Sequence, residues 1–232
     1  MDLLDRLMRT APVQERFGPS LPALLAPRID RLPAIARRVG AVLALLVGVV
    51  IVALVLRTRD PSYSGSVGSA HFSVSWPRSM TREPTPRGDL LLLRQSAGSG
   101  LVASFEVAPL RLPAYSGEIS GLLPVLAINY ERRLEQRYGA RFTPWSLGRT
   151  RIINTAAFTF TYKLYVASDP APYFGRVVFI TAHLHGDRSG LILSMLQDPA
   201  TLKQATEPAK PTPDAVGAGG PVQEPLQHLR IS

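Results

Sequence analysis

The residues best suited to chemistry lie in one short segment, between Thr181 and Gly190. Within it His183, His185 and Asp187 follow one another at a spacing of two residues. Side chains two residues apart on a strand share one face, so both imidazoles could approach the same ion. Imidazole nitrogens and carboxylates are common ligands of zinc. The spacing therefore defines His183, His185 and Asp187 as candidate metal ligands.

The segment is similar to the His-x-His-x-Asp-His motif of the metallo-β-lactamase superfamily, which implies a metal-dependent hydrolase. Arg188 stands where the motif has the histidine after its aspartate, and a permanent cation repels a metal ion. Only His71 and His228 remain elsewhere in the chain. The favoured interpretation is a strand whose polar face leads into a turn, with no metal and no cofactor. The hydrolase stays as the alternative.

Other catalytic motifs are missing from the sequence. The 232 residues include no cysteine, which excludes disulfide scaffolds, thiol catalysis and cysteine-ligated metal centres. There is no Gly-x-Ser-x-Gly elbow, no His-Glu-x-x-His motif and no phosphate-binding loop. We therefore expect that the protein is not an enzyme.

Arginines form the second candidate site. Six gather around a predicted helix and the strand that follows it: Arg132, Arg133, Arg137, Arg141, Arg149 and Arg151. Such a cluster could bind phosphate-bearing polymers or lipid headgroups. Residues 60–202 carry 14 basic and 10 acidic side chains, and this net charge of +4 is small for nucleic-acid binding. We expect a solvated face and no nucleic-acid partner.

An apolar segment near the N-terminus predicts that the chain is attached to a membrane. Residues 39–56 contain 18 residues without one polar side chain. As a helix the segment would be about 27 Å long, close to the ~30 Å hydrocarbon core of a bilayer. A cleaved signal peptide is the alternative, but Arg57 and Arg59 stand where its small-residue cleavage site should lie. The sequence predicts an uncleaved transmembrane helix.

The arginines that flank this helix predict its orientation. Four lie within 20 residues before it and two directly after it. The positive-inside rule then places the N-terminus in the cytoplasm and the rest of the chain, after residue 57, outside the cell membrane. Gly40, Ala44 and Gly48 fall on one helix face, where a second helix backbone could approach closely. These three residues are therefore candidates for a helix–helix contact that would form a dimer through the span.

Composition divides the remaining chain. Residues 1–38 contain five prolines among apolar and basic residues, which fits either a kinked amphipathic leader on the inner membrane surface or a disordered one. The Ser/Gly-rich residues 57–69 are expected to be a tether. Residues 206–232, rich in Pro, Gly and Ala, are expected to be a disordered tail. The folded domain is predicted at residues 70–205.

Periodicity within residues 70–205 predicts an α+β fold. Apolar alternation or short apolar runs predict seven strands, near residues 72–76, 90–94, 101–107, 142–151, 158–164, 178–184 and 191–196. An apolar stripe predicts a long helix at residues 123–138 with Gly139 as its cap, and Asp198-Pro199 opens a short final helix. The expected fold is an antiparallel sheet of about seven strands with one long and one short helix packed on it, preceded by one transmembrane helix.

This order of elements resembles a known fold. The opening Phe72-Ser73-Val74-Ser75-Trp76-Pro77, the mid-chain helix, the later hairpins and the terminal helix are similar to the PsbP-like fold of PsbP, DcrB and LpqN-type lipoproteins. The resemblance implies a binding or assembly module with no shared active site. We expect a single-pass, membrane-anchored extracytoplasmic adaptor for a protein, lipid or envelope component. A structural subunit of a membrane complex is a further alternative.

Overall fold

The structure is a computed structural model of the chain. It describes residues 42–50, 60–68, 70–86, 88–115, 117–118, 121–152, 155–166, 171–181, 188–202 and 211–231. The chain divides into two units, Met1–Arg59 and Asp60–Ser232. The first unit is described only at residues 42–50, which are helical.

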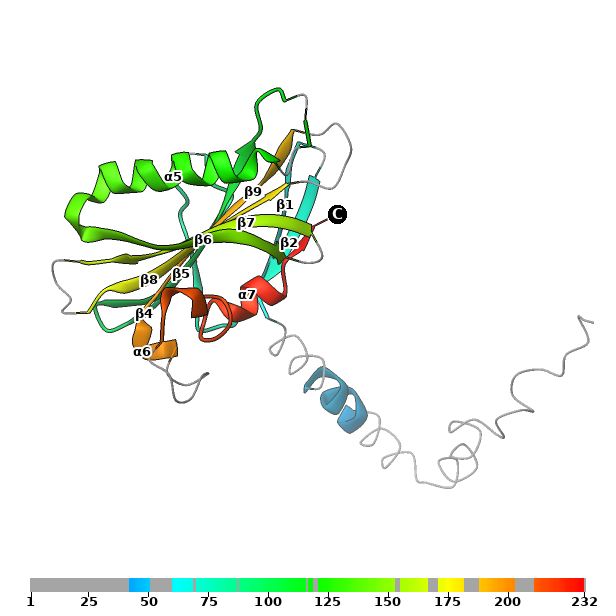
Figure 1. Ribbon diagram of the computed structural model, residues 1–232. Helices are drawn as coiled ribbons and strands as arrows, with labels where there is room; N and C mark the ends of the chain where they lie inside the picture. The colour runs from blue at the N-terminus through cyan, green and yellow to red at the C-terminus, as the bar shows by residue number, and fades with distance from the viewer. Residues whose placement is uncertain are drawn as a thin grey trace, which may run out of the picture. The chain divides into compact units, whose positions relative to one another are not determined.

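A seven-stranded antiparallel sheet is the centre of the second unit (Figure 1). Its strand order is β3-β4-β5-β9-β8-β7-β6. The bounds are β3 Thr81–Glu83, β4 Leu91–Ala97, β5 Gly100–Arg111, β6 Phe142–Ile152, β7 Thr155–Leu164, β8 Tyr173–Thr181 and β9 Ser189–Gln197. The predicted α+β class with a sheet of about seven antiparallel strands is confirmed.

Alternation along the strands produces two packed faces. On β5, Ala103, Phe105 and Val107 are buried on one face, while Ser104 and Glu106 lie on the other. The register then stacks Phe105 between Leu93 of β4 and Met195 of β9, which are also fully buried. Period-two patterns thus translate directly into core positions.

One face of the sheet is covered by the long helix α5, Leu123–Tyr138 (Figure 1). Its predicted apolar stripe packs on Phe160 and Phe179, with Tyr130 stacked edge-on against Phe179 at 5.6 Å between ring centroids. Gly139 ends the helix with φ of 57°, a conformation that strongly favours glycine, and begins the short 3-10 turn η2, Gly139–Arg141. The helix prediction is confirmed.

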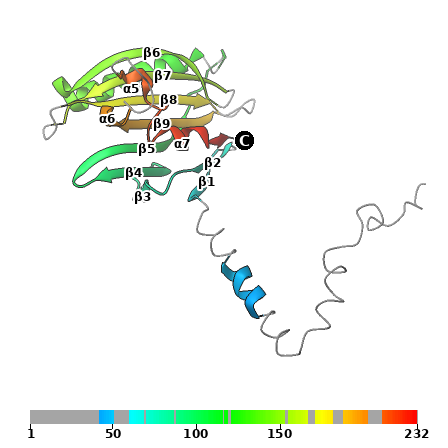
Figure 2. The same cartoon turned by 90° about the horizontal axis from the view of Figure 1, so that it is seen from below.

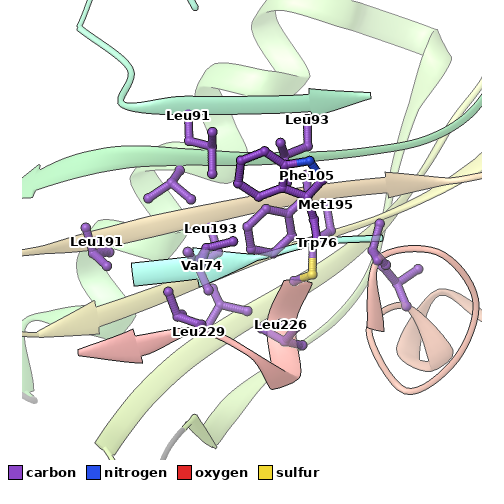
Figure 3. Close-up of a cluster of buried hydrophobic side chains, with 14 of the residues drawn as sticks. Val74, Trp76, Leu91, Leu93, Phe105, Leu191, Leu193, Met195, Leu226 and Leu229 are labelled. Atoms are coloured by element: carbon purple, nitrogen blue, oxygen red, sulfur yellow. The ribbon is translucent and has the colours of Figure 1, made fainter. Parts of the chain in front are cut away.

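The opposite face is covered by a second, three-stranded sheet and short helices (Figure 2). Its order is β1-β2-β10, with bounds β1 Ser62–Val67, β2 Ala70–Ser75 and β10 Arg230–Ile231. The helices are α6 Pro199–Leu202, η3 Pro213–Ala215 and α7 Gln223–Gln227. The strand predicted at residues 72–76 therefore belongs to this smaller sheet, and β3, which was not predicted, completes the larger one. The core between the two sheets brings Trp76 and Phe105 together with Leu226 and Leu229 (Figure 3).

The predicted tether at residues 57–69 is wrong where the structure describes it. Ser62–Val67 is a regular strand paired with β2 over six residues. Its serines alternate with Tyr63, Gly65 and Val67, and only this second set faces the core. The period-two pattern of this strand is not evident in the sequence because only two of the three inward positions carry large apolar side chains and the serines suggest a linker.

The disordered tail predicted at residues 206–232 is also wrong where the structure describes it. Residues 211–231, which we name the C-terminal segment, carry η3, α7 and β10. Its large apolar side chains are sparse, but Val216, Val222, Leu226 and Leu229 are all buried in the core between the sheets. Composition averaged over the segment missed that each apolar residue has a place in that core.

A polar network also fixes the C-terminal segment. Asp214 accepts hydrogen bonds from Ser146, from the indole N–H of Trp145 at 3.0 Å and from Thr161 at 2.9 Å. Arg176 donates to the carbonyl oxygen of Val216 at 3.1 Å. Burial alone would raise the pKa of Asp214, but these hydrogen bonds and the nearby Arg176 hold it below its usual value. The charged carboxylate is therefore the form that stabilises the docked segment.

The membrane prediction concerns residues that are described only in part. Ala44 and Gly48 lie in the helical residues 42–50, whereas Gly40 and the leader 1–38 lie outside the described residues. Within the described part of the chain, no helix has the length and hydropathy needed to cross a bilayer.

Candidate functional site

A cavity of about 640 Å³ lies at the N-terminal end of α5. We name it the α5 cavity. Its walls come from the segment before α5, from the first turn of α5, and from the ends of β6 and β7 that meet in one hairpin. The lining residues are Tyr115, Glu118, Gly121, Leu123, Arg149, Thr150, Arg151, Ala156, Ala157 and Phe158. Its volume is typical of sites for small ligands.

Strand register places two arginines of this cavity on one face. Arg149 pairs with Phe158 and Arg151 pairs with Ala156 in the β6–β7 hairpin. Phe158 packs in the core beneath α5, so both guanidiniums emerge on the same side of the sheet as the helix. Residues two apart on a strand are about 7 Å apart, close enough for both to contact one ligand.

The start of α5 adds to the positive potential. Pro124 occupies its first turn, no side chain caps it, and no acidic residue lies in that turn. The backbone N–H groups of a helix start carry a partial positive charge that attracts anions. The apolar Leu123, at this helix start, and Phe158, the cross-strand neighbour of Arg149, also line the cavity.

The α5 cavity therefore combines cationic and apolar walls. Arginine stays charged at every physiological pH and can donate two parallel hydrogen bonds to a carboxylate or phosphate. Leu123 and Phe158 suit an apolar group next to that anion. Tyr115 stands at the rim with half of its surface exposed, at 50%, and can cover a ligand.

The six predicted arginines do not form one patch. All six are exposed, but they lie at different places around α5. Arg149 and Arg151 line the cavity at its N-terminal end, whereas Arg141 lies in η2 at its C-terminal end, about 24 Å away for a helix of 16 residues. On the helix, Arg133 lies over the ring of Tyr130 at 5.1 Å, and the charge of Arg137 acts on Glu106 of β5. Of the six, Arg149 and Arg151 are the two that line the α5 cavity.

A half-buried carboxyl group lies beside α5, outside the cavity. The pKa of Glu106 is raised to about 7. Burial is the largest cause, followed by the charge and the hydrogen bond of Asp89, and the charge of Arg137 acts in the opposite direction. The same β5 position faces Ser194 of β9, whose side chain hydrogen-bonds Tyr130. This group is a titrating contact within the packing of α5 and contributes no wall to the α5 cavity.

The predicted metal ligands His183, His185 and Asp187 lie outside the described residues. Their neighbour Arg188 is described and lines a separate cavity with Arg111. Among the residues that the structure describes, no three histidine, aspartate or glutamate side chains are grouped as a metal site would require.

Sequence reasoning found the arginine pair but not its surroundings. The two-residue spacing of Arg149 and Arg151 in a predicted strand is the signal that could have separated them from the other four. Tyr115, in the segment before α5, and Leu123, the first residue of α5, line the cavity because of the path by which the chain enters the helix, and no local pattern predicts that path.

Comparison with known proteins supports the fold alone. No protein-family model matches the chain, and no curated protein matches its sequence. The solution structure of the cyanobacterial PsbP of Synechocystis sp. PCC 6803 is similar with a TM-score of 0.50 and 9% identity, over 74% of this chain and 92% of that one. The Ran-binding protein Mog1p of Saccharomyces cerevisiae aligns with a TM-score of 0.43 and 13% identity, over 74% and 96% of the two chains. The second unit thus has a PsbP-like fold.

Proposed function

We propose that the unit with the PsbP-like fold is a binding module rather than a catalyst, and that the α5 cavity is its ligand site. The ligand carries a carboxylate or phosphate next to an apolar group. The observation that carries this proposal is that Arg149 and Arg151 line the α5 cavity together with the apolar residues Leu123 and Phe158.

The charge pattern supports binding of an anion at this site. Among the described residues that line the α5 cavity, one side chain is acidic, that of Glu118, and two are arginines. The helix start adds partial positive charge on the same side. An anionic ligand with an apolar group gains binding free energy from the arginines and from the apolar wall. An uncharged ligand gains binding free energy from the apolar wall alone.

Hexyl phosphate is a suitable probe because it joins a phosphate to a short apolar chain. The full-length variant with Arg149→Gln and Arg151→Gln is expected to bind it at least tenfold more weakly, measured by calorimetry. Each charge-assisted hydrogen bond contributes about 1.5–3 kcal/mol, and ~1.4 kcal/mol corresponds to tenfold in affinity.

Two controls make this result specific. Arg132→Gln removes an exposed charge from α5 that does not line the cavity, and it should leave affinity unchanged. Hexanol, which lacks the phosphate, should bind the parent and the double variant equally weakly. Equal losses from Arg132→Gln and from the double variant would refute the site.

We also propose that residues 39–56 anchor this module in the cell membrane, with the N-terminus in the cytoplasm. The support is the uninterrupted apolar sequence and the excess of arginines before it. In this cysteine-free chain, Ser99→Cys lies at an exposed turn and should react with an impermeant thiol reagent on intact cells. Ser20→Cys should react only after permeabilisation. The reverse pattern would show the opposite orientation.

A further inference from the structure

Strand β1 is an open edge of the smaller sheet. It pairs with β2 on one side, and no described strand pairs with its other side. Figure 2 shows it at the outer side of the β1–β2 pair. Ser62, Ser64 and Ser66 are exposed along it. An unpaired strand edge is a template on which another strand can form backbone hydrogen bonds.

The other described edges are protected in ways that β1 is not. Strand β3 has three residues, two of them charged, and β10 has two residues, one of them Arg230. Strand β6 is interrupted by a register shift beside Pro144 and carries Arg149 and Arg151. Short length, charge, proline and bulges are the devices that prevent edge pairing. In β1 six residues run in regular register without a charge, a proline or a bulge.

The hydrogen-bond pattern shows which groups of β1 are available. The N–H of Trp76 donates to the carbonyl of Pro61 at 3.1 Å, so these two residues form a hydrogen-bonded pair in the β1–β2 register. Hydrogen-bonded and non-hydrogen-bonded pairs alternate in an antiparallel ladder. The N–H and C=O groups of the three exposed serines therefore point away from β2, toward the open edge.

We propose that β1 pairs antiparallel with β1 of a second copy of this chain, about a two-fold axis at Ser64. In this register Ser64 faces its own counterpart, and Ser62 faces Ser66 of the other copy. All three serines of each copy then exchange backbone hydrogen bonds, whereas a shift of two residues in either direction leaves one serine unpaired. On the core side Tyr63 faces Gly65, so no two large side chains oppose each other.

A second copy is the occupant that this strand fits best. The register that satisfies every outward serine is symmetric, as an isologous two-fold interface requires. The strand carries no charge that would select an oppositely charged partner.

Cysteine cross-linking tests the register directly because the natural chain contains no cysteine. In the full-length chain, Ser64→Cys should give a covalent dimer with a short bis-thiosulfonate reagent, since directly opposite Cα atoms lie about 5.5 Å apart. Ser62→Cys or Ser66→Cys alone should not, because each residue then lies about 14 Å from its own counterpart. Co-expression of these two variants should restore the dimer.

A proline variant separates pairing at the edge from folding of the chain. Ser66→Pro removes an N–H that points away from β2, so it should abolish cross-linking through Ser64→Cys while the melting temperature stays within a few degrees. The proposal is overturned if Ser64→Cys and the mixture both stay monomeric, or if Ser62→Cys alone cross-links as well as Ser64→Cys. Cross-linking of Ser64→Cys to a protein of another mass would also overturn it.

Discussion

A chain that ends at Ala205, the boundary that composition suggests, is expected to lose its cooperative fold. It would lack the C-terminal segment and with it the buried Val and Leu side chains of Val216, Val222, Leu226 and Leu229. Full burial of such a side chain contributes about 1.5–3 kcal/mol, so the loss of four approaches the ~5–15 kcal/mol by which domains are stable. Urea unfolding followed by circular dichroism should show a broad transition at low urea, or none.

Point variants test whether the buried side chains of this segment are what stabilises the fold. Leu229→Ala leaves a hole in the core between the sheets and should lower the free energy of unfolding by about 2–5 kcal/mol. His228→Ala changes the preceding exposed residue and should change stability by less than ~0.5 kcal/mol. A truncated chain that unfolds at the same urea concentration as the full chain would show that the C-terminal segment does not belong to the folding unit.

Replacement of Glu106 is expected to change how stability depends on pH. The pKa of Glu106 is about 7 in the folded protein against a usual value of 4.5, so folding favours the protonated form. Its contribution is therefore fully present below pH 4.5 and is lost as the pH rises through 7. The full shift corresponds to ~3 kcal/mol, and solvent screening of this partly exposed group reduces it to about 1–2 kcal/mol.

Glu106→Gln keeps the shape and removes the charge. The variant should match the parent at pH 5 and melt several degrees higher at pH 8, since each kcal/mol changes the melting temperature of a domain of this size by about 2–4 °C. Asp89→Asn removes the neighbouring charge and hydrogen bond that raise the pKa of Glu106, so it should give an intermediate profile. Measurements from pH 5 upward avoid the acid range in which Asp214 loses its charge. Identical pH profiles for Glu106→Gln and the parent would contradict the assignment.

The sequence alone does not predict that the C-terminal segment is folded. Composition predicts a disordered tail because Pro, Gly and Ala dominate residues 206–232. Burial depends instead on whether each of a few apolar side chains finds a place in an existing core. That place is formed by β2, β5 and β9, which lie far away in the chain.

Sequence by itself determined two kinds of element. These are helices with an apolar residue facing the core in each turn, and strands in which every second residue faces the core. The stripe from Leu123 to Tyr138 with Gly139 after it and the alternation of Ala103, Phe105 and Val107 each predicted the observed element. Burial of one face is a local property of a helix or strand, so its period appears in the sequence. The α+β class follows from counting such elements, and the apolar character of residues 39–56 is equally a property of sequence alone.

Tertiary structure decided what depends on which elements become neighbours. The sequence singles out six arginines, but the pairing of Arg149 with Phe158 and the position of α5 select two of them for a cavity. The pKa of Glu106 is raised because the fold buries its side chain and because Asp89 approaches it there. The open edge of β1 exists because no described strand pairs with its outer side. Periodicity reports whether a residue is buried, whereas strand order and register decide what it is buried against.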